Sequence, residues 1–130
     1  MGKSIGVISL KGGVGKTSVV VALGSAIAGF NKKVLLVDGN FSAPNLGIHF
    51  KIIDPETSLH HVLDREINAK DAIYTLKNLD ILPTSIFANK QVNPLKLKDR
   101  LDYLKKKYDY IIYDSSPSLN DETLGVVLAS

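Results

Sequence analysis

A glycine-rich segment near the start of the chain carries the residues whose chemistry is most specific. It reads Leu10-Lys11-Gly12-Gly13-Val14-Gly15-Lys16-Thr17 and continues into Ser18. Glycine allows a backbone to approach an anion closely and to adopt positive φ, so that consecutive N–H groups can surround a phosphate chain. Lys16 would bring a positive charge to the β and γ phosphates, and the Thr17 hydroxyl would ligate Mg²⁺. We therefore predict that residues 10–17 form a phosphate-binding loop.

The surroundings of this loop favour the same interpretation. An apolar run with Ile5, Val7 and Ile8 precedes it and is typical of a buried strand, and a helix is predicted over residues 17–28. A helix that starts at the loop points the positive end of its dipole at a bound anion. The common pattern G-x-x-x-x-G-K-[ST] fails at its first position, where this chain has Leu10. A chance glycine-rich turn with surface lysines is the alternative, and it leaves the strand–loop–helix order unexplained.

Two aspartates follow apolar segments elsewhere in the chain. Asp38 ends residues 33–38 and Asp114 ends residues 108–114, and both segments are predicted to be strands. In open α/β sheets, ligands bind beyond the carboxyl ends of the strands, which is where these carboxylates would lie. Mg²⁺ prefers oxygen ligands of this kind. Each aspartate alone could be a strand-end turn residue, whereas the pair beside a phosphate-binding loop predicts a Mg²⁺ site.

The remaining pattern alternates strands with helices, which is typical of an α/β fold with a parallel sheet. A further strand is predicted over residues 79–82, halted by Pro83. The first helix is expected to end at Gly29 and Asn31, because both residue types tolerate the left-handed conformation of a helix stop. Helices are also predicted at residues 58–63, after Asn93 and Pro94 with a core stripe of Leu97, Leu101 and Leu104, and from Asn120 to Ser130. Another one or two turns are predicted within residues 69–76.

Composition places the chain among globular proteins with a buried core. It has 130 residues, of which 45% are hydrophobic and 22% are charged, and its formal net charge is +3. This length suits one compact domain, so residues 1–130 are predicted to form a single one. The absence of cysteine excludes disulfides and cysteine-ligated clusters within these residues. His60 and His61 have no evident third ligand and are interpreted as a surface or half-buried pair.

A family resemblance begins in the glycine-rich loop. The order Lys-Gly-Gly-x-Gly-Lys-Thr resembles the deviant Walker A box of the MinD/ParA ATPases. Residues 38–46 are similar to the family's D-x-D-x-x-x-x-N-L segment, and residues 110–119 are similar to its Walker B region. The resemblance implies a three-layer α/β P-loop NTPase fold, in which helices flank a mostly parallel sheet with the four predicted strands in the order third, second, fourth, first. Family members continue for several more elements, so the fold is expected to be truncated at its C-terminal side.

The resemblance also implies roles for single residues. Lys11 matches a signature lysine that reaches across a dimer to the phosphates bound by the other subunit. Asp38 and Asp114 match acidic residues that hold Mg²⁺, mostly through its waters. The second aspartate of D-x-D, which orients or activates the attacking water, is Asn40 here, and an amide cannot accept a proton from water. The nucleotide-binding set would be Lys11, Gly12, Gly13, Val14, Gly15, Lys16, Thr17 and Ser18; the catalytic set would be Lys11, Lys16 and Asn40; and the metal set would be Thr17, Asp38 and Asp114.

The function implied by the resemblance is an ATP-dependent molecular switch with ATP and Mg²⁺ as cofactors and slow hydrolysis. ATP would join two subunits face to face, and hydrolysis would release them. Such a cycle positions other components in cell division, DNA segregation or the placement of a surface machine. The protein would be cytoplasmic and would associate with a membrane or the nucleoid through the dimer or the family's C-terminal region.

Two other functions stay open from the sequence. A nucleotide-binding scaffold without hydrolysis is consistent with Asn40. An iron–sulfur carrier on the same fold is opposed by the absence of cysteine, although the cysteines of such carriers would lie beyond Ser130. Base recognition would also lie beyond Ser130, and ATP is favoured over GTP by the loop resemblance alone.

Overall fold

A single five-stranded sheet forms the centre of the molecule. The computed structural model describes residues 2–8, 15–40, 46, 72–76, 78–84, 94–115 and 121–130. The strands are β1 (Lys3–Val7), β2 (Val34–Asp38), β3 (Tyr74–Leu76), β4 (Leu79–Leu82) and β5 (Tyr110–Asp114). Their order across the sheet is β1-β5-β2-β4-β3, and only β3 is antiparallel to its neighbour. Among the described residues, β1 therefore forms one edge of the sheet and β3 the other.

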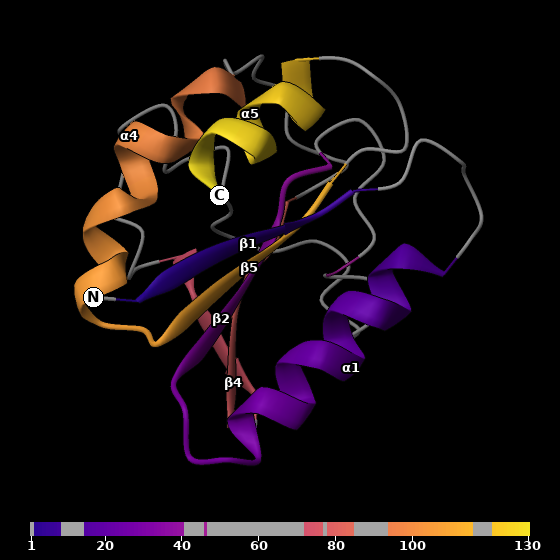
Figure 1. The fold of residues 1–130 in the computed structure, drawn as a ribbon, viewed down its shortest axis with the longest axis vertical. Helices are drawn as coiled ribbons and strands as arrows, with labels where there is room; N and C mark the ends of the chain where they lie inside the picture. Colours follow the sequence, from indigo (N-terminus) through magenta and orange to yellow (C-terminus); the bar gives the residue numbers. More distant parts are fainter. Residues whose placement is uncertain are drawn as a thin grey trace.

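Helices cover both faces of this sheet (Figure 1). The long helix α1 (Lys16–Ala28) lies on one face. The opposite face carries α5 (Asp121–Ala129) together with a helical segment built from η2 (Pro94–Lys96), α4 (Leu97–Leu101) and η3 (Asp102–Lys106). The expected three-layer arrangement of helices around a mostly parallel sheet is thereby confirmed, as is the strand order that the family resemblance implied.

Strand β2 shows why both faces must be covered. All five of its residues are buried. Because side chains alternate along a strand, Leu35 and Val37 pack toward α4 and α5, whereas Val34 and Leu36 pack toward α1. A continuous apolar strand of this kind is typical of a parallel sheet buried on both sides. The predicted stripe of Leu97, Leu101 and Leu104 is fully or almost fully buried and completes the first of these two cores.

Two elements differ from the prediction. The one or two turns predicted over residues 69–76 are wrong for Tyr74–Leu76, which forms β3 and pairs with β4 so that Leu76 faces Leu79, whereas Ala72 lies in a 3-10 turn. Aromatic and β-branched residues such as Tyr74 and Thr75 favour this extended state. The helix after Pro94 is present, but it tightens into 3-10 turns at both ends of α4.

The boundaries of α1 also differ slightly from the prediction. The helix begins at Lys16 rather than at Thr17. Gly29 remains right-handed, with φ of −63°, whereas Asn31 has the left-handed φ of 62°. Asn31 alone therefore provides the conformational stop that was expected of both residues.

Gly39, directly after β2, sits where its neighbours leave no room for a side chain. A Cβ atom at this position would lie 2.6 Å from Val126 Cγ2 and 2.9 Å from the carbonyl oxygen of Asp114. Only glycine allows the backbone to pass this close to β5 and α5. The end of β2 is thus held tightly against the end of β5.

Several predictions fall on residues that the structure does not describe. They concern the helix at residues 58–63, the pair His60 and His61, and the capping residues Asn93 and Asn120. In the described part of the chain, no helix has the length and apolar character needed to cross a membrane.

Candidate functional site

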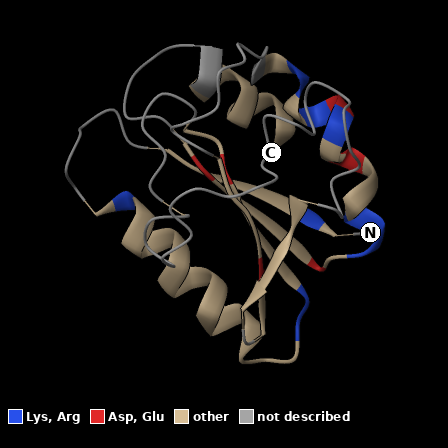
Figure 2. Ribbon diagram, turned by 180° about the vertical axis from the view of Figure 1, so that it is seen from behind, with Lys and Arg blue, Asp and Glu red and all other residues tan. Residues whose placement is uncertain are grey.

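The site lies at the carboxyl edge of the sheet, where β5 and β2 end side by side. Asp114 is the last residue of β5 and Asp38 is the last residue of β2, and the two are direct register partners. Both side chains are buried, and the two acidic strand ends are visible next to each other in Figure 2. The sequence-based expectation that parallel strands would bring these carboxylates together is therefore met by the geometry.

Helix α1 starts against this pair. Gly15 precedes it with φ of 72°, a left-handed conformation that side-chain-bearing residues rarely adopt. It provides no capping side chain, and the first turn of α1 contains no acidic residue. The positive end of the helix dipole is consequently not neutralised by the helix's own first turn, which is the arrangement that suits a bound anion.

Lys16 and Thr17 converge on the carboxylate of Asp114. The Lys16 Nζ donates to Asp114 Oδ1 at 3.0 Å, and the Thr17 hydroxyl donates to Asp114 Oδ2 at 2.6 Å. Lys16 Nζ also donates to the carbonyl oxygen of Ser115. An ammonium group has three donors, so these two bonds leave one that can reach a phosphate oxygen.

Backbone N–H groups help to orient Asp38. Its Oδ1 accepts from the N–H of Asn40 at 3.1 Å, and its Oδ2 accepts from the N–H of Leu46 at 3.2 Å. Asn40 itself is 2% exposed, so the residue at the family's second acidic position lies inside the site. These two amide donors fix the direction of the Asp38 carboxylate.

A line of hydrogen bonds joins the strand ends across the sheet. The Ser115 hydroxyl donates to the carbonyl of Val7 at 2.7 Å, and the N–H of Gly39 donates to the carbonyl of Asp114 at 2.7 Å. The Thr84 hydroxyl donates to the carbonyl of Asp38 at 2.8 Å. Each of these carbonyls belongs to the last residue of a strand, and each donor follows the neighbouring strand. The four parallel strand ends are therefore held in one row, which fixes the spacing of the two carboxylates.

The charges at this edge are compensated locally. Burying an ionised carboxylate is costly unless it is paired or hydrogen-bonded. The Lys16 and Asp114 side chains are only 9% and 1% exposed, so their ion pair is largely shielded from water. The Asp38 carboxylate accepts from the amide N–H groups of Asn40 and Leu46. A divalent cation beside both carboxylates would add further positive charge at this edge.

The donor set fits Mg²⁺ held partly by water. The Thr17 hydroxyl already lies 2.6 Å from a carboxylate oxygen of Asp114, and Asp38 lies across the strand pair from it. These are oxygen ligands, which Mg²⁺ prefers, and Mg²⁺ usually keeps several of its waters. Within the described ranges, no group of three or more His, Cys, Asp or Glu side chains is placed to hold a metal. A hydroxyl, two carboxylates and water would therefore share the ion.

The structure brings together every described residue of the predicted site. Lys16, Thr17, Asp38, Asn40 and Asp114 all lie at the carboxyl edge of β2 and β5 or at the adjoining start of α1. The loop residues Lys11, Gly12, Gly13 and Val14 lie outside the described residues.

Sequence reasoning did not identify the residues that support this site. Ser115 lies inside the segment that resembles a Walker B region, but its side chain bonds to β1 rather than to a ligand. Thr84 comes two residues after β4 and is distant in sequence from the carbonyl it holds. A hydroxyl residue just after a buried strand is the one local signal for either contact.

Comparison with known proteins gives a consistent result. A protein-family model described as an AAA domain matches residues 2–130. An uncharacterized ATP-binding protein of Methanocaldococcus jannaschii is 40% identical over 121 residues, which cover 91% of this chain and 46% of that protein. The sporulation initiation inhibitor protein Soj of Bacillus subtilis is 36% identical over 144 aligned positions, which cover all of this chain and 56% of Soj.

A solved structure agrees with this match. The septum site-determining protein MinD of Pyrococcus horikoshii, in complex with Mg-ADP, superposes with a TM-score of 0.88 at 34% identity. The alignment covers all of this chain and 55% of that chain. The present chain thus spans about half the length of the relatives that it matches.

The row of strand-end hydrogen bonds generates a prediction about Thr84. A Thr84→Val substitution keeps the side-chain shape but leaves the buried carbonyl of Asp38 without its hydroxyl donor. We expect the free energy of unfolding to fall by about 1–3 kcal/mol, measured by urea denaturation. Thr75→Val is the matched control, because the Thr75 hydroxyl bonds to Asp80 at an exposed position, and it should change stability by less than about 0.5 kcal/mol. Equal effects of the two substitutions would contradict the role given to Thr84.

Proposed function

This chain belongs to the MinD/ParA family of P-loop ATPases, and from that premise we propose that it binds Mg-ATP and acts as an ATP-dependent molecular switch. We further propose that residues 1–130 form a single nucleotide-binding unit. The observation that carries the proposal is the meeting of Lys16 and Thr17 with Asp114 at the start of α1, beside the buried Asp38. A phosphate-binding lysine, a metal-binding hydroxyl and two acidic strand ends are the parts that a Mg-nucleotide requires.

The proposed phosphate site consists of residues 11–18. The described part contributes Gly15, whose left-handed backbone leads into α1, and the first turn of that helix with Lys16, Thr17 and Ser18. Lys16 would move from Asp114 toward the β and γ phosphates, and the helix N-terminus would face the same anion. The contribution of Lys11, Gly12, Gly13 and Val14 is proposed from the family resemblance.

The proposed metal ligands are Thr17, Asp38 and Asp114. Mg²⁺, when bound, would neutralise negative charge on the β and γ phosphates. Asp114 has a second task, since its carboxylate holds both Lys16 and Thr17 in place. Asp38 is aimed by the N–H groups of Asn40 and Leu46 and would act through water in the coordination sphere of the metal.

We propose that the chain also hydrolyses ATP and that Asn40 sets the rate of hydrolysis. Asn40 is buried two residues after Asp38, where it could orient an attacking water by hydrogen bonds. Its amide cannot accept the proton of that water. Phosphoryl transfer depends strongly on positioning, so we propose slow hydrolysis rather than none. A scaffold that binds nucleotide without hydrolysing it is the second candidate, and the same buried amide is the observation that favours it.

The switch would operate through a dimer. We propose that ATP joins two copies face to face, with Lys11 of each copy reaching the phosphates bound by the other, and that hydrolysis separates them. The similar proteins are named for inhibition of sporulation initiation and for septum site determination. These names support a positioning role in cell division as the cellular use of the switch. From the family resemblance we propose DNA segregation as the other use, and peripheral association with a membrane or the nucleoid.

Calorimetry with Mg-ATP tests the binding site directly. We expect the parent chain to bind, and Lys16→Ala to weaken binding by about tenfold to hundredfold because a charged hydrogen bond to phosphate is lost. Removal of Mg²⁺ by a chelator should also weaken binding. Lys98→Ala is the matched control, since it removes an exposed lysine of α4 and should leave the affinity unchanged. A folded parent chain that does not bind Mg-ATP would refute this part of the proposal.

Steady-state measurement of phosphate release tests whether the side chain at position 40 limits the rate of hydrolysis. Asn40→Asp would restore a group that can accept a proton, and we expect hydrolysis to accelerate by about tenfold or more. Asn31→Asp adds the same charge at an exposed turn and serves as the control. If Asn40→Asp is no faster than the parent, proton acceptance at this position does not limit turnover.

Light scattering tests the proposed dimer. With Mg-ATP, the parent chain should shift from monomer to dimer, and Lys11→Ala should remain monomeric while it still binds nucleotide. The reason is that loss of Lys11 would remove its contact with the phosphates bound by the other copy, whereas Lys16 and Thr17 would still hold the nucleotide. A Lys11→Ala variant that dimerises as readily as the parent would argue against this arrangement.

A further inference from the structure

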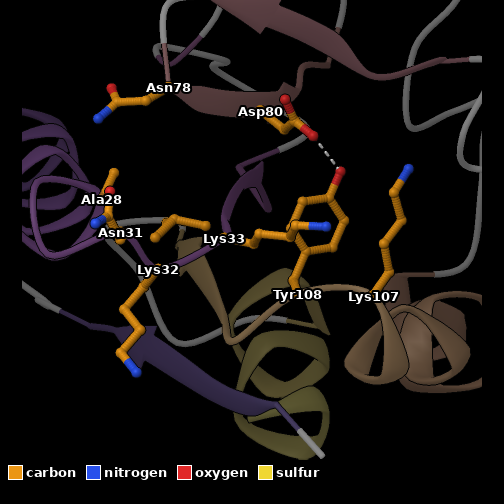
Figure 3. A pocket seen from close by; sticks show the side chains of 9 residues that line it. Ala28, Asn31, Lys32, Lys33, Asn78, Asp80, Lys107 and Tyr108 are labelled. Carbon is orange, nitrogen blue, oxygen red and sulfur yellow. Dashed lines mark hydrogen bonds between the residues drawn. The ribbon is translucent and has the colours of Figure 1, made fainter.

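A cavity of about 410 Å³ lies at the amino ends of β2, β4 and β5, at the end of the sheet away from the Asp38–Asp114 pair (Figure 3). Three separate stretches of chain form it: the turn between α1 and β2, the β3–β4 hairpin, and the turn before β5. Its lining residues are Ala28, Asn31, Lys32, Lys33, Val34, Asn78, Asp80, Lys107 and Tyr108. The volume is within the usual range for a small-ligand site.

The charged residues of this lining are mostly cationic. Three lysines contribute to it, against one aspartate. Figure 3 shows Lys33 and Lys107 on the side of the cavity where Tyr108 lies, Asn31 and Asn78 on the other side, and Lys32 pointing away. In the described part of the chain, none of the three lysines forms an ion pair.

Asp80 brings a negative charge into the cavity, but both of its carboxylate oxygens already accept from hydroxyl groups, and it forms no ion pair with these lysines among the described residues. Oδ1 accepts from the Thr75 hydroxyl at 2.8 Å, and Oδ2 accepts from the Tyr108 hydroxyl. Burial and, after it, the hydrogen bond to Asp80 raise the pKa of Tyr108 above its usual value, so its hydroxyl remains a donor at neutral pH. The side chains left to meet a ligand are therefore chiefly donors: two ammonium groups and the amides of Asn31 and Asn78.

The two inward lysines are attached to segments that hydrogen bonds hold together. The N–H groups of Asp109 and Tyr110 donate to the carbonyl of Lys33 at 2.8 and 3.1 Å, and the N–H of Lys33 donates to Asp109 Oδ2 at 2.8 Å. Lys107 lies over the ring of Tyr108, with its Nζ 5.6 Å from the ring centroid. Asp109 brings a second negative charge close to the cavity without lining it, so the three lysines and two aspartates together leave one net positive charge, which includes that of Lys32.

We propose that this cavity binds a small multivalent anion of the phosphate class, with Lys33 and Lys107 as the charged ligands and Asn31 and Asn78 as neutral donors. Lysine is a compact point charge on a flexible stem and suits the tetrahedral oxygens of a phosphate. The lining contains no arginine, so the two lysines would bind the anion as point charges, as lysines do in other phosphate sites. The inference does not depend on the proposed nucleotide site.

The cavity and the nucleotide site are physically separate. Strand β2 runs from Val34 in the cavity to Asp38 in the site, four residues at roughly 3.3 Å each, or about 13 Å. Helix α1 also connects them, because Lys16 begins it in the nucleotide site and Ala28 ends it in the cavity. An anion in the cavity would thus contact residues that touch neither Lys16 nor Asp114.

Amide NMR with inorganic pyrophosphate tests the proposal residue by residue, which separates this cavity from the phosphate loop. At about 0.15 M ionic strength, where exposed charges are largely screened, we expect saturable shifts at Lys33, Asn78 and Lys107. A double variant, Lys33→Ala with Lys107→Ala, should weaken this binding at least about tenfold. Saturable shifts at Gly15 to Ser18 alone would place the anion in the nucleotide site and would overturn the proposal for the cavity.

The matched control is Lys96→Ala with Lys98→Ala, which removes the same charge from exposed positions outside the cavity. It should leave the shifts at the cavity unchanged, and equal weakening in both double variants would overturn the proposal in favour of a general charge effect. A neutral peptide with one phosphoserine forms a second arm. If pyrophosphate saturates the shifts at the lower concentration, the ligand is a free anion. If the peptide saturates them at the lower concentration, the ligand is a phosphorylated protein. If neither probe saturates at the cavity, the proposal fails.

Discussion

Two buried carboxylates at the carboxyl edge of a parallel sheet set the conditions that the rest of the site has to meet. Asp38 and Asp114 end adjacent strands as register partners, out of contact with water. A carboxylate in this position needs donors or a cation nearby. Asp114 obtains them from the first two residues of α1, and Asp38 obtains them from amides on the segment after β2. The hydrogen bonds to these two carboxylates therefore fix where α1 begins against the sheet and where the segment after β2 runs.

The parallel sheet gives the two ends of the molecule opposite chemistry. At the carboxyl ends of the strands, acidic side chains and a helix N-terminus are suited to a metal with its phosphate ligand. At the amino ends, Lys33 and Lys107 project from turns that precede β2 and β5. Figure 2 shows acidic residues at the carboxyl ends of the strands, and basic residues together with acidic ones at the amino ends. Strand β2 and helix α1 extend between the two ends, so a single layer of core packing supports both.

Much of the fold could be predicted because its signals are local. The apolar runs at β2, β4 and β5 and the leucine stripe on α4 follow from periodicity, and the family resemblance supplied the strand order. Strand β3 was missed because a three-residue strand is shorter than any period that could distinguish it from a helix. Its extended state depends on pairing with β4, a contact that the sequence around Tyr74 does not encode by itself.

The sequence by itself determined the chemistry of the candidate site: a lysine and a hydroxyl at a helix start, and two aspartates at strand ends. Short motifs identify these residues, and in a parallel sheet residues at these positions lie together at the carboxyl edge. Only the tertiary structure decided which groups hold them. Thr84 and Ser115 contact strand ends across long separations in sequence, and Leu46 reaches Asp38 from within the segment after β2. Asp80 meets Tyr108 only because β4 and the start of β5 lie near each other in space. Such pairings depend on the register of the sheet and the packing of its layers, and no local pattern specifies either.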